Sequence, residues 1–156
     1  MPEISDPAPD FTLPRDGGGS VSLSALRPAP VVLFFYPRDA TSGCTTENKA
    51  FSDLMGAFAA LGAQVFGISK DTVASHDKFR DKYGLRAPLL SDAEGTACED
   101  YGVWKEKSMY GKTFWGIERS TFLIGGDGRI VQVWRKVKVP GHAEAVLEAA
   151  KALVNG

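Results

Sequence analysis

The chain carries two cysteines, and the surroundings of one of them suggest chemistry. Cys44 lies in the segment 41–47, TSGCTTE, directly after the apolar stretch 31–36. A helix that begins near Ser42 would place this thiol in its first turn, where unpaired N–H groups and the helix dipole favour the thiolate. Thiolate is the nucleophilic form of cysteine. The spacing therefore indicates a reactive thiol.

A second interpretation of Cys44 is that it is a small buried apolar residue, as free cysteines often are. Its neighbours are Thr, Ser, Gly and Glu rather than core residues, which argues against burial. Gly43 would let a substrate approach the backbone, and the Thr41 hydroxyl can donate to or accept from a small polar ligand. These features favour the reactive thiol.

The elements that must position Cys44 alternate between strands and helices. The run 31–36 is typical of a strand buried on both faces. Apolar spacing and capping residues predict helices from about 42 to 61, at 72–83, at 94–101 and from 141 onward. Further strands are expected at 64–69, 89–90, 120–124 and 129–134, and glycines predict hairpin turns at 17–19 and 125–128.

This order predicts an α/β chain with a thioredoxin-like fold. We expect one domain, residues 1–156, with a mixed central β-sheet, helices on both faces and an N-terminal β-hairpin. Ligand chemistry in such sheets lies at the carboxyl ends of strands, where Cys44 follows the strand at 31–36.

Composition narrows the function classes. There are 18 Lys and Arg against 19 Asp and Glu, so the net charge of −1 argues against a nucleic-acid binder that relies on a basic field. No apolar run approaches a membrane span, and the N-terminal MPEISDPAPDF lacks the features of a signal peptide, so we expect a cytoplasmic protein. Two cysteines are too few for a disulfide scaffold.

Pro37, Thr41 and Cys44 form a Pro-x-x-x-Thr-x-x-Cys pattern that resembles the signature of the peroxiredoxins. The resemblance covers nearly the whole chain, and the most similar subgroup is the bacterioferritin comigratory protein, or PrxQ, type. The segments that carry it are APDFTL at 8–13, FFYP at 34–37, GIS at 67–69, LSD at 90–92, YGVW at 101–104 and GIERSTFLI at 116–124.

The resemblance implies a thiol-dependent peroxidase that reduces hydrogen peroxide and alkyl hydroperoxides. Cys44 would attack one peroxide oxygen and become a sulfenic acid. The family stabilises the leaving oxygen with the Thr41 hydroxyl, backbone N–H groups near Gly43 and an arginine that matches Arg119. Pro37 would shield the thiol.

Glu47 matches a position that orients the arginine, although a first-turn acid favoured by the helix dipole explains it equally well. Without the resemblance, the residues alone indicate that Arg119 is a solvated charged residue at the start of a strand.

The same resemblance implies no metal and no organic cofactor. The expected partners are a hydroperoxide and a reductant, either thioredoxin, glutaredoxin or a small thiol, and the expected oligomeric state is a monomer. The main alternative function is a redox sensor whose sulfenic acid passes oxidation to a partner protein. His76 and His142 are not spaced as metal ligands with the cysteines, which argues against a zinc site, and no local signature surrounds either histidine, which argues against a Cys–His hydrolase.

Cys98 decides how the sulfenic acid would be reduced. Many members of the subgroup carry a resolving cysteine five residues after the first, but Lys49 occupies that position here. Another subset carries the resolving cysteine on the next helix, and the segment 72–84 has no cysteine. Cys98 falls on the apolar side of a short predicted helix and is expected to be a core residue. We therefore expect a mechanism with a single essential cysteine.

Overall fold

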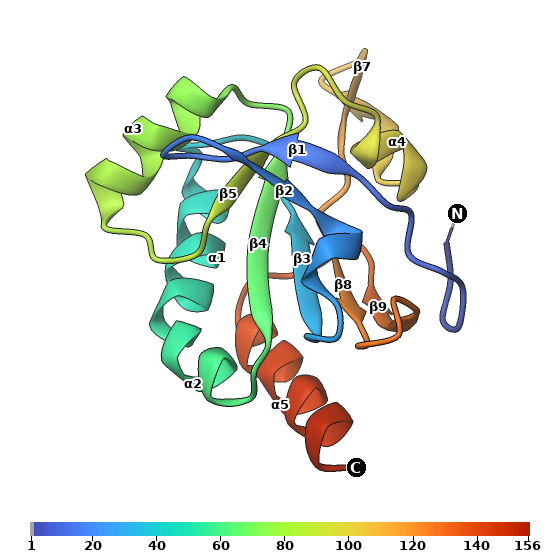
Figure 1. Cartoon of the computed structure of the whole chain (residues 1–156). Coiled ribbons are helices and arrows are strands. Elements are labelled where there is room, and N and C mark those ends of the chain that lie inside the picture. The colour runs from blue at the N-terminus through green and yellow to red at the C-terminus, as the bar shows by residue number, and fades with distance from the viewer. Residues whose placement is uncertain (1) are drawn as a thin grey trace.

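A central sheet of five strands organises the computed structural model, which describes residues 2–156 (Figure 1). The strand order is β5-β4-β3-β8-β9, in which β3, β4 and β5 run parallel while β8 and β9 run antiparallel to their neighbours. The strands are β3 (Val31–Phe35), β4 (Gln64–Ser69), β5 (Leu89–Ser91), β8 (Ser120–Ile124) and β9 (Ile130–Trp134). The mixed sheet expected from the sequence is confirmed.

The middle of the sheet is apolar on both sides. Every residue of β3 and of β8 is buried, which explains why β3 is a continuous apolar run rather than an alternating one. Side chains that point to opposite faces of the sheet enter two separate apolar clusters. Each cluster needs its own cover.

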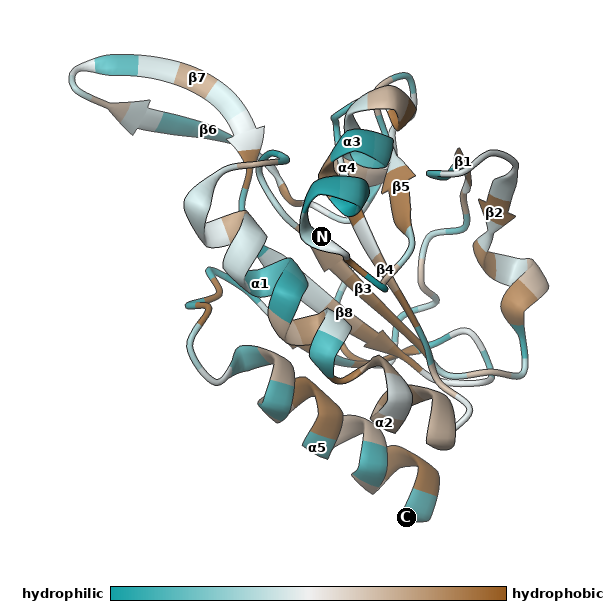
Figure 2. Ribbon diagram, turned by 90° about the vertical axis from the view of Figure 1, so that its left-hand side faces the viewer, coloured by the Kyte–Doolittle hydropathy of each residue, from teal (hydrophilic) through white to brown (hydrophobic). Residues whose placement is uncertain are grey.

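Helices cover one face and shorter elements cover the other (Figures 1 and 2). The first cluster packs under four helices: α1 (Ser42–Asp53), α2 (Met55–Ala60), α3 (Val73–Tyr83) and α5 (His142–Asn155). The second packs under the hairpin of β1 (Thr12–Pro14) and β2 (Ser20–Ser22), the 3-10 helix η1 (Leu23–Leu26) and the short helix α4 (Ala97–Asp100). Both the N-terminal hairpin and helices on both faces were expected.

Local signals explain where several helices begin and end. The Thr72 hydroxyl accepts a hydrogen bond from the N–H of Ser75 and caps α3, while Gly84 ends α3 with a φ of 60°. The helix expected up to residue 61 is divided at Leu54, whose N–H bonds to the Phe51 carbonyl three residues back instead of four. This tighter turn separates α1 from α2.

The hairpins around the turns at 17–19 and 125–128 were expected, but a third hairpin was not. β6 (Trp104–Met109) and β7 (Lys112–Ile117) pair antiparallel through a turn in which Tyr110 and Gly111 both have positive φ. Most of its side chains are exposed, so it lacks the apolar alternation that marks half-buried strands. Figure 2 shows it standing out from the body of the molecule.

The C-terminal helix α5 is part of the apolar cluster that the helices cover. α5 buries Ala143, Val146, Leu147 and Ala150 in the cluster that also contains α1 and β3. Within residues 2–156, no helix combines the length and the apolar character needed to cross a membrane.

Close packing in β4 generates a stability prediction. A Cβ added at Gly67 would lie 2.8 Å from both Leu89 and Phe34 side-chain atoms, so Gly67→Ala should lower the free energy of unfolding by roughly 1–3 kcal/mol through overpacking. Urea denaturation measures this change. Gly56→Ala in α2 is the control, because a Cβ there meets nothing and should be neutral or stabilise by about 0.4–1 kcal/mol. An unchanged urea midpoint in Gly67→Ala would contradict the packing described.

Candidate active site

The end of β3 leads directly into the segment that holds Cys44. Thr41, in an extended conformation, is the N-cap of α1, and the first helical hydrogen bond runs from the Thr45 N–H to the Thr41 carbonyl at 2.9 Å. Cys44 is the third residue of α1, so the N–H groups from Ser42 to Cys44 lie in the turn that leaves donors without helical partners. The predicted helix start is confirmed.

Sheet register brings Arg119 to the same place. β3 pairs with β8 so that Phe35 lies opposite Ser120, which puts Arg119, the residue before β8, beside the carboxyl end of β3. Its Nη2 donates to Cys44 Sγ at 3.4 Å, and its Nη1 donates to Glu47 Oε1 at 2.6 Å. The guanidinium therefore bridges two side chains of the first turns of α1.

Gly43 makes room for this bridge. A Cβ at position 43 would lie 3.3 Å from Arg119 Nη2, tighter than an ordinary contact. Glycine there keeps the backbone open beside the thiol and also accommodates the guanidinium. The sequence predicted only the first of these roles.

The expectation that Cys44 escapes burial is wrong. Cys44 is 1% exposed and packs in the helix-covered apolar cluster, because its position in α1 points it toward the sheet. Of the polar residues around it in sequence, Ser42 and Thr46 are exposed, whereas Thr45 and Glu47 are buried like Cys44 itself. Burial and a contact with a cation thus occur together at this sulfur.

The ion pair beneath the thiol is largely removed from water. Burial raises the pKa of Glu47 to about 7, and the neighbouring Arg119 offsets only part of that effect. Burial also works against the charge of Arg119, but Glu47 and then Cys44 outweigh it and raise the pKa of the guanidinium. Glu47 Oε2 has no hydrogen-bond partner, so the carboxylate is held by Arg119 through one oxygen.

Thr41 has its hydroxyl proton committed. Its Oγ1 donates to the Arg38 carbonyl at 2.8 Å, which leaves the oxygen lone pairs available to accept a hydrogen bond. Pro37 begins this loop and is half-buried. The Asn48 amide donates to the Cys44 carbonyl at 2.9 Å and fixes the second turn of α1.

A buried network of hydrogen bonds and charges holds the loop between β3 and α1. The sequence analysis did not predict this network. Asp39 accepts from the Tyr36 hydroxyl at 2.6 Å and lies 2.7 Å from Nδ1 of His76, while Nε2 of His76 lies 2.9 Å from the Leu90 carbonyl. A carboxylate and a carbonyl can only accept, so His76 must donate from both ring nitrogens and carry a positive charge. Burial disfavours that charge, but Asp39 outweighs it and raises the pKa of His76.

Cys98 lies away from the thiol, and no hydrogen bond joins His142 to Cys44 within residues 2–156. Cys98 is buried in the cluster on the opposite face of the sheet, its N–H bonded to Asp92, and burial followed by the Asp92 charge raises the pKa of its thiol. Nε2 of His142 lies 2.8 Å from the Thr121 hydroxyl, and burial followed by Arg119 lowers the pKa of His142 to about 4. Within residues 2–156, no three His, Cys, Asp or Glu side chains converge as metal ligands.

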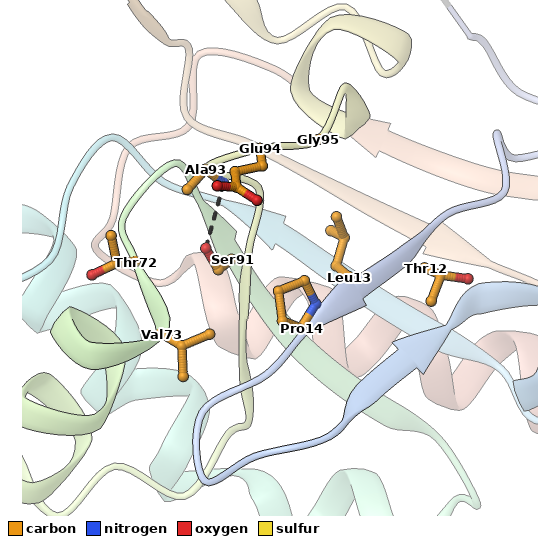
Figure 3. A pocket seen from close by; sticks show the side chains of 9 residues that line it. All are labelled: Thr12, Leu13, Pro14, Thr72, Val73, Ser91, Ala93, Glu94 and Gly95. Carbon is orange, nitrogen blue, oxygen red and sulfur yellow. Dashed lines mark hydrogen bonds between the residues drawn. The ribbon is translucent and has the colours of Figure 1, made fainter.

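A separate pocket of about 360 Å³ opens between β1, the start of α3 and the loop after β5 (Figure 3). Leu13, Pro14 and Val73 give it an apolar side, and Ser91 and Glu94 a polar one. None of the residues grouped around Cys44 lines it. The residues that line this pocket include no cysteine.

Comparison with known proteins agrees with the site. The AhpC/TSA family model matches residues 4–133. The chain is 50% identical to peroxiredoxin Bcp of Xanthomonas campestris pv. campestris over 94% of this chain and 92% of that one, and 46% identical to peroxiredoxin Bcp of Bacillus subtilis over 96% and 95%.

A solved structure of the Xanthomonas campestris bacterioferritin comigratory protein superposes with a TM-score of 0.90 at 46% identity. The superposition covers 99% of this chain and 98% of that one. Mycobacterium tuberculosis AhpC superposes with a TM-score of 0.82 at 25% identity, over 98% and 93% of the two chains. The predicted resemblance and thioredoxin-like fold are confirmed: the chain belongs to the AhpC/TSA family and, within it, to the peroxiredoxins of the Bcp or PrxQ type, which are thiol peroxidases.

Proposed function

We propose that this peroxiredoxin reduces hydrogen peroxide and alkyl hydroperoxides with Cys44 as its single essential cysteine and an external thiol as reductant. The contact that carries the proposal is the 3.4 Å hydrogen bond from the Arg119 guanidinium to Cys44 Sγ. The same guanidinium is held in place by its hydrogen bond to Glu47. A cation fixed beside a sulfur stabilises thiolate and offers donors to a bound peroxide. The Xanthomonas campestris relative is described as having alkyl peroxide reduction activity, which supports the second substrate class.

The first half of the cycle oxidises Cys44. Its thiolate attacks one peroxide oxygen, a sulfur–oxygen bond forms, the O–O bond breaks and the second oxygen leaves as water or an alcohol after taking a proton. Arg119 and the free N–H groups of the first turn of α1 stabilise the negative charge on the leaving oxygen. Thr41 accepts the peroxide O–H, because its own proton is committed to Arg38.

The second half needs a thiol from outside the chain. Cys44 and Cys98 pack in apolar clusters on opposite faces of the sheet, so an internal disulfide would require the helices that carry them to unwind. An external thiol then attacks the sulfenic sulfur, which releases water and forms a mixed disulfide. A further thiol attacks the external sulfur of that disulfide and releases Cys44 as thiolate. Two unpaired thiols are also typical of a reducing compartment, and we propose a cytoplasmic location on that ground.

Arg119 is the first residue to test. Arg119→Ala should lower the rate constant for Cys44 oxidation roughly 10²–10³-fold, the usual cost of losing one preorganised donor. Stopped-flow fluorescence with hydrogen peroxide measures it. Arg129→Ala removes an equal charge at an exposed position and is the control. A rate constant near that of the unmodified protein in Arg119→Ala would remove the guanidinium from the reaction.

The single-cysteine cycle predicts different outcomes for the two thiols. Cys44→Ser should abolish steady-state peroxide consumption, whereas Cys98→Ser should keep most of it with dithiothreitol as donor. Peptide mapping after one equivalent of peroxide should locate one added oxygen on Cys44. A dominant Cys44–Cys98 disulfide together with an inactive Cys98→Ser protein would overturn the cycle, and oxidation of Cys44 without turnover on any thiol would favour the sensor instead.

The raised pKa of Glu47 predicts a pH-dependent stability. The folded chain holds the Glu47 proton more tightly than the unfolded chain, whose Glu titrates near 4.5. The resulting stabilisation is complete below that pH and is lost as the pH rises through about 7. The difference in Tm between the unmodified protein and Glu47→Gln should therefore fall between pH 5 and pH 8, by a few degrees if roughly 1 kcal/mol is lost.

Differential scanning calorimetry at several pH values measures this difference. Glu148→Gln is the control, because Glu148 is an exposed carboxylate paired only with Lys151 and should give a flat difference. A difference that stays flat from pH 5 to pH 8 would contradict the raised pKa of Glu47, because a Glu47 that is anionic throughout this range binds no proton in either the folded or the unfolded chain.

A further inference from the structure

The hairpin of β6 and β7 concentrates the exposed large apolar side chains of the molecule. Six such residues are exposed within residues 2–156, and four of them lie on this hairpin: Met109, Tyr110, Phe114 and Trp115. Figure 2 shows the hairpin projecting from the body on the side of α1. Exposed apolar groups gathered on a projecting element mark an interaction site rather than random exposure.

The two faces of the hairpin differ in charge. Residues opposite each other in an antiparallel pair share a face, so Lys107 lies with Phe114 and Met109 with Lys112. One face therefore carries three lysines and no acid, and we call it the lysine face: Lys105, Lys107, Met109, Lys112 and Phe114. The opposite face carries Trp104, Glu106, Ser108, Thr113, Trp115 and Ile117.

The lysine face continues to the thiol. The Lys107 ammonium donates to the Ile117 carbonyl. A Cβ at Gly116 would lie 3.5 Å from both the Lys107 and the Phe114 side chains, so Lys107, Phe114 and Gly116 form one continuous surface. Ile117 precedes Arg119 by two residues, and Arg119 contacts Cys44. Burial and then the charge of Arg119 lower the pKa of Lys107, as expected for a cation near the site.

We propose that the lysine face docks a protein dithiol reductant whose thiol is surrounded by apolar and acidic side chains. The inference rests on the proposed function, because only a Cys44 sulfenic acid needs such a donor. A small thiol gains nothing from an exposed aromatic surface, whereas a protein uses apolar contact for affinity and charge for orientation. Cys44 is almost fully buried, so a protein reductant needs a binding surface beside it.

The docked reaction balances without another reactant. One thiolate of the partner attacks the sulfenic sulfur, an S–S bond forms, the S–O bond breaks and the oxygen leaves as water with a proton. The second thiol of the partner then attacks the partner's own sulfur in the mixed disulfide, which releases Cys44 as thiolate. The partner loses two electrons and becomes a disulfide.

Turnover with protein and small-thiol donors tests the inference. Peroxide consumption is measured with reduced thioredoxin, with reduced glutaredoxin and with dithiothreitol. Phe114→Ala and Lys112→Glu should each lower the ratio of protein-driven to dithiothreitol-driven kcat/KM roughly tenfold, equal to about 1.4 kcal/mol of binding. Trp115→Ala and Glu106→Gln change the opposite face of the same hairpin and should keep the ratio.

The outcomes separate the inference from the proposed function. No turnover of the unmodified protein with dithiothreitol would overturn the proposed function and the docking with it. Turnover with dithiothreitol but with neither protein donor, or an unchanged ratio in both lysine-face variants, would overturn the docking alone.

Two other binding partners of the lysine face, a membrane surface and a second copy of the chain, are tested directly. Sedimentation with phosphatidylglycerol vesicles that Phe114→Ala abolishes would assign the lysine face to a membrane surface. A dimer in light scattering that Phe114→Ala dissociates would assign it to a second copy of the chain. Either result would overturn the docking of a reductant.

Discussion

One guanidinium connects the parts of the site. Arg119 directly precedes β8 and donates both to Cys44 and to Glu47, so it connects the sheet to the first turns of α1. Removing an arginine and a carboxylate from water costs several kcal/mol per ion unless their geometry repays it. Glu47 Oε2 is left without a partner, so the pair is not arranged for maximum stability. The arrangement is understood better as a cation kept in position beside a sulfur.

The loop between β3 and α1 is held from its other side by a second buried pair. His76 carries its charge against Asp39, and Asp39 also accepts from Tyr36 at the end of β3. Asp39 thus cannot move without leaving a buried imidazolium unpaired, which is expensive. Thr41 follows two residues later and inherits this rigidity through its bond to Arg38. The segment that leads to Cys44 therefore has one buried pair, Asp39–His76, before the helix start and another, Glu47–Arg119, after it.

Local patterns in the sequence predicted the order of elements and the position of Cys44 at a helix start, because strand hydrophobicity and helix capping act over a few residues. Arg119 was found only through the family resemblance. It lies 75 residues from Cys44 in the sequence, and its proximity to Cys44 depends on the register of β8 against β3. The Asp39–His76 pair was missed for the same reason. The hairpin of β6 and β7 was missed because its side chains face solvent on both sides, and binary patterning has no signal there.

The separation of the two cysteines gives the protruding hairpin its significance. A thiol that shares a pocket with the sulfenic acid would trap it at once, whereas Cys98 lies under the opposite face of the sheet. An unresolved sulfenic acid is open to further oxidation to sulfinic acid, which most cells do not reverse. The lifetime of oxidised Cys44 then depends on how quickly a donor arrives and how long it stays. Charge on the lysine face raises the first quantity and apolar area raises the second. On the single-cysteine cycle that we propose, the chain gains from a recognition surface placed directly beside Cys44.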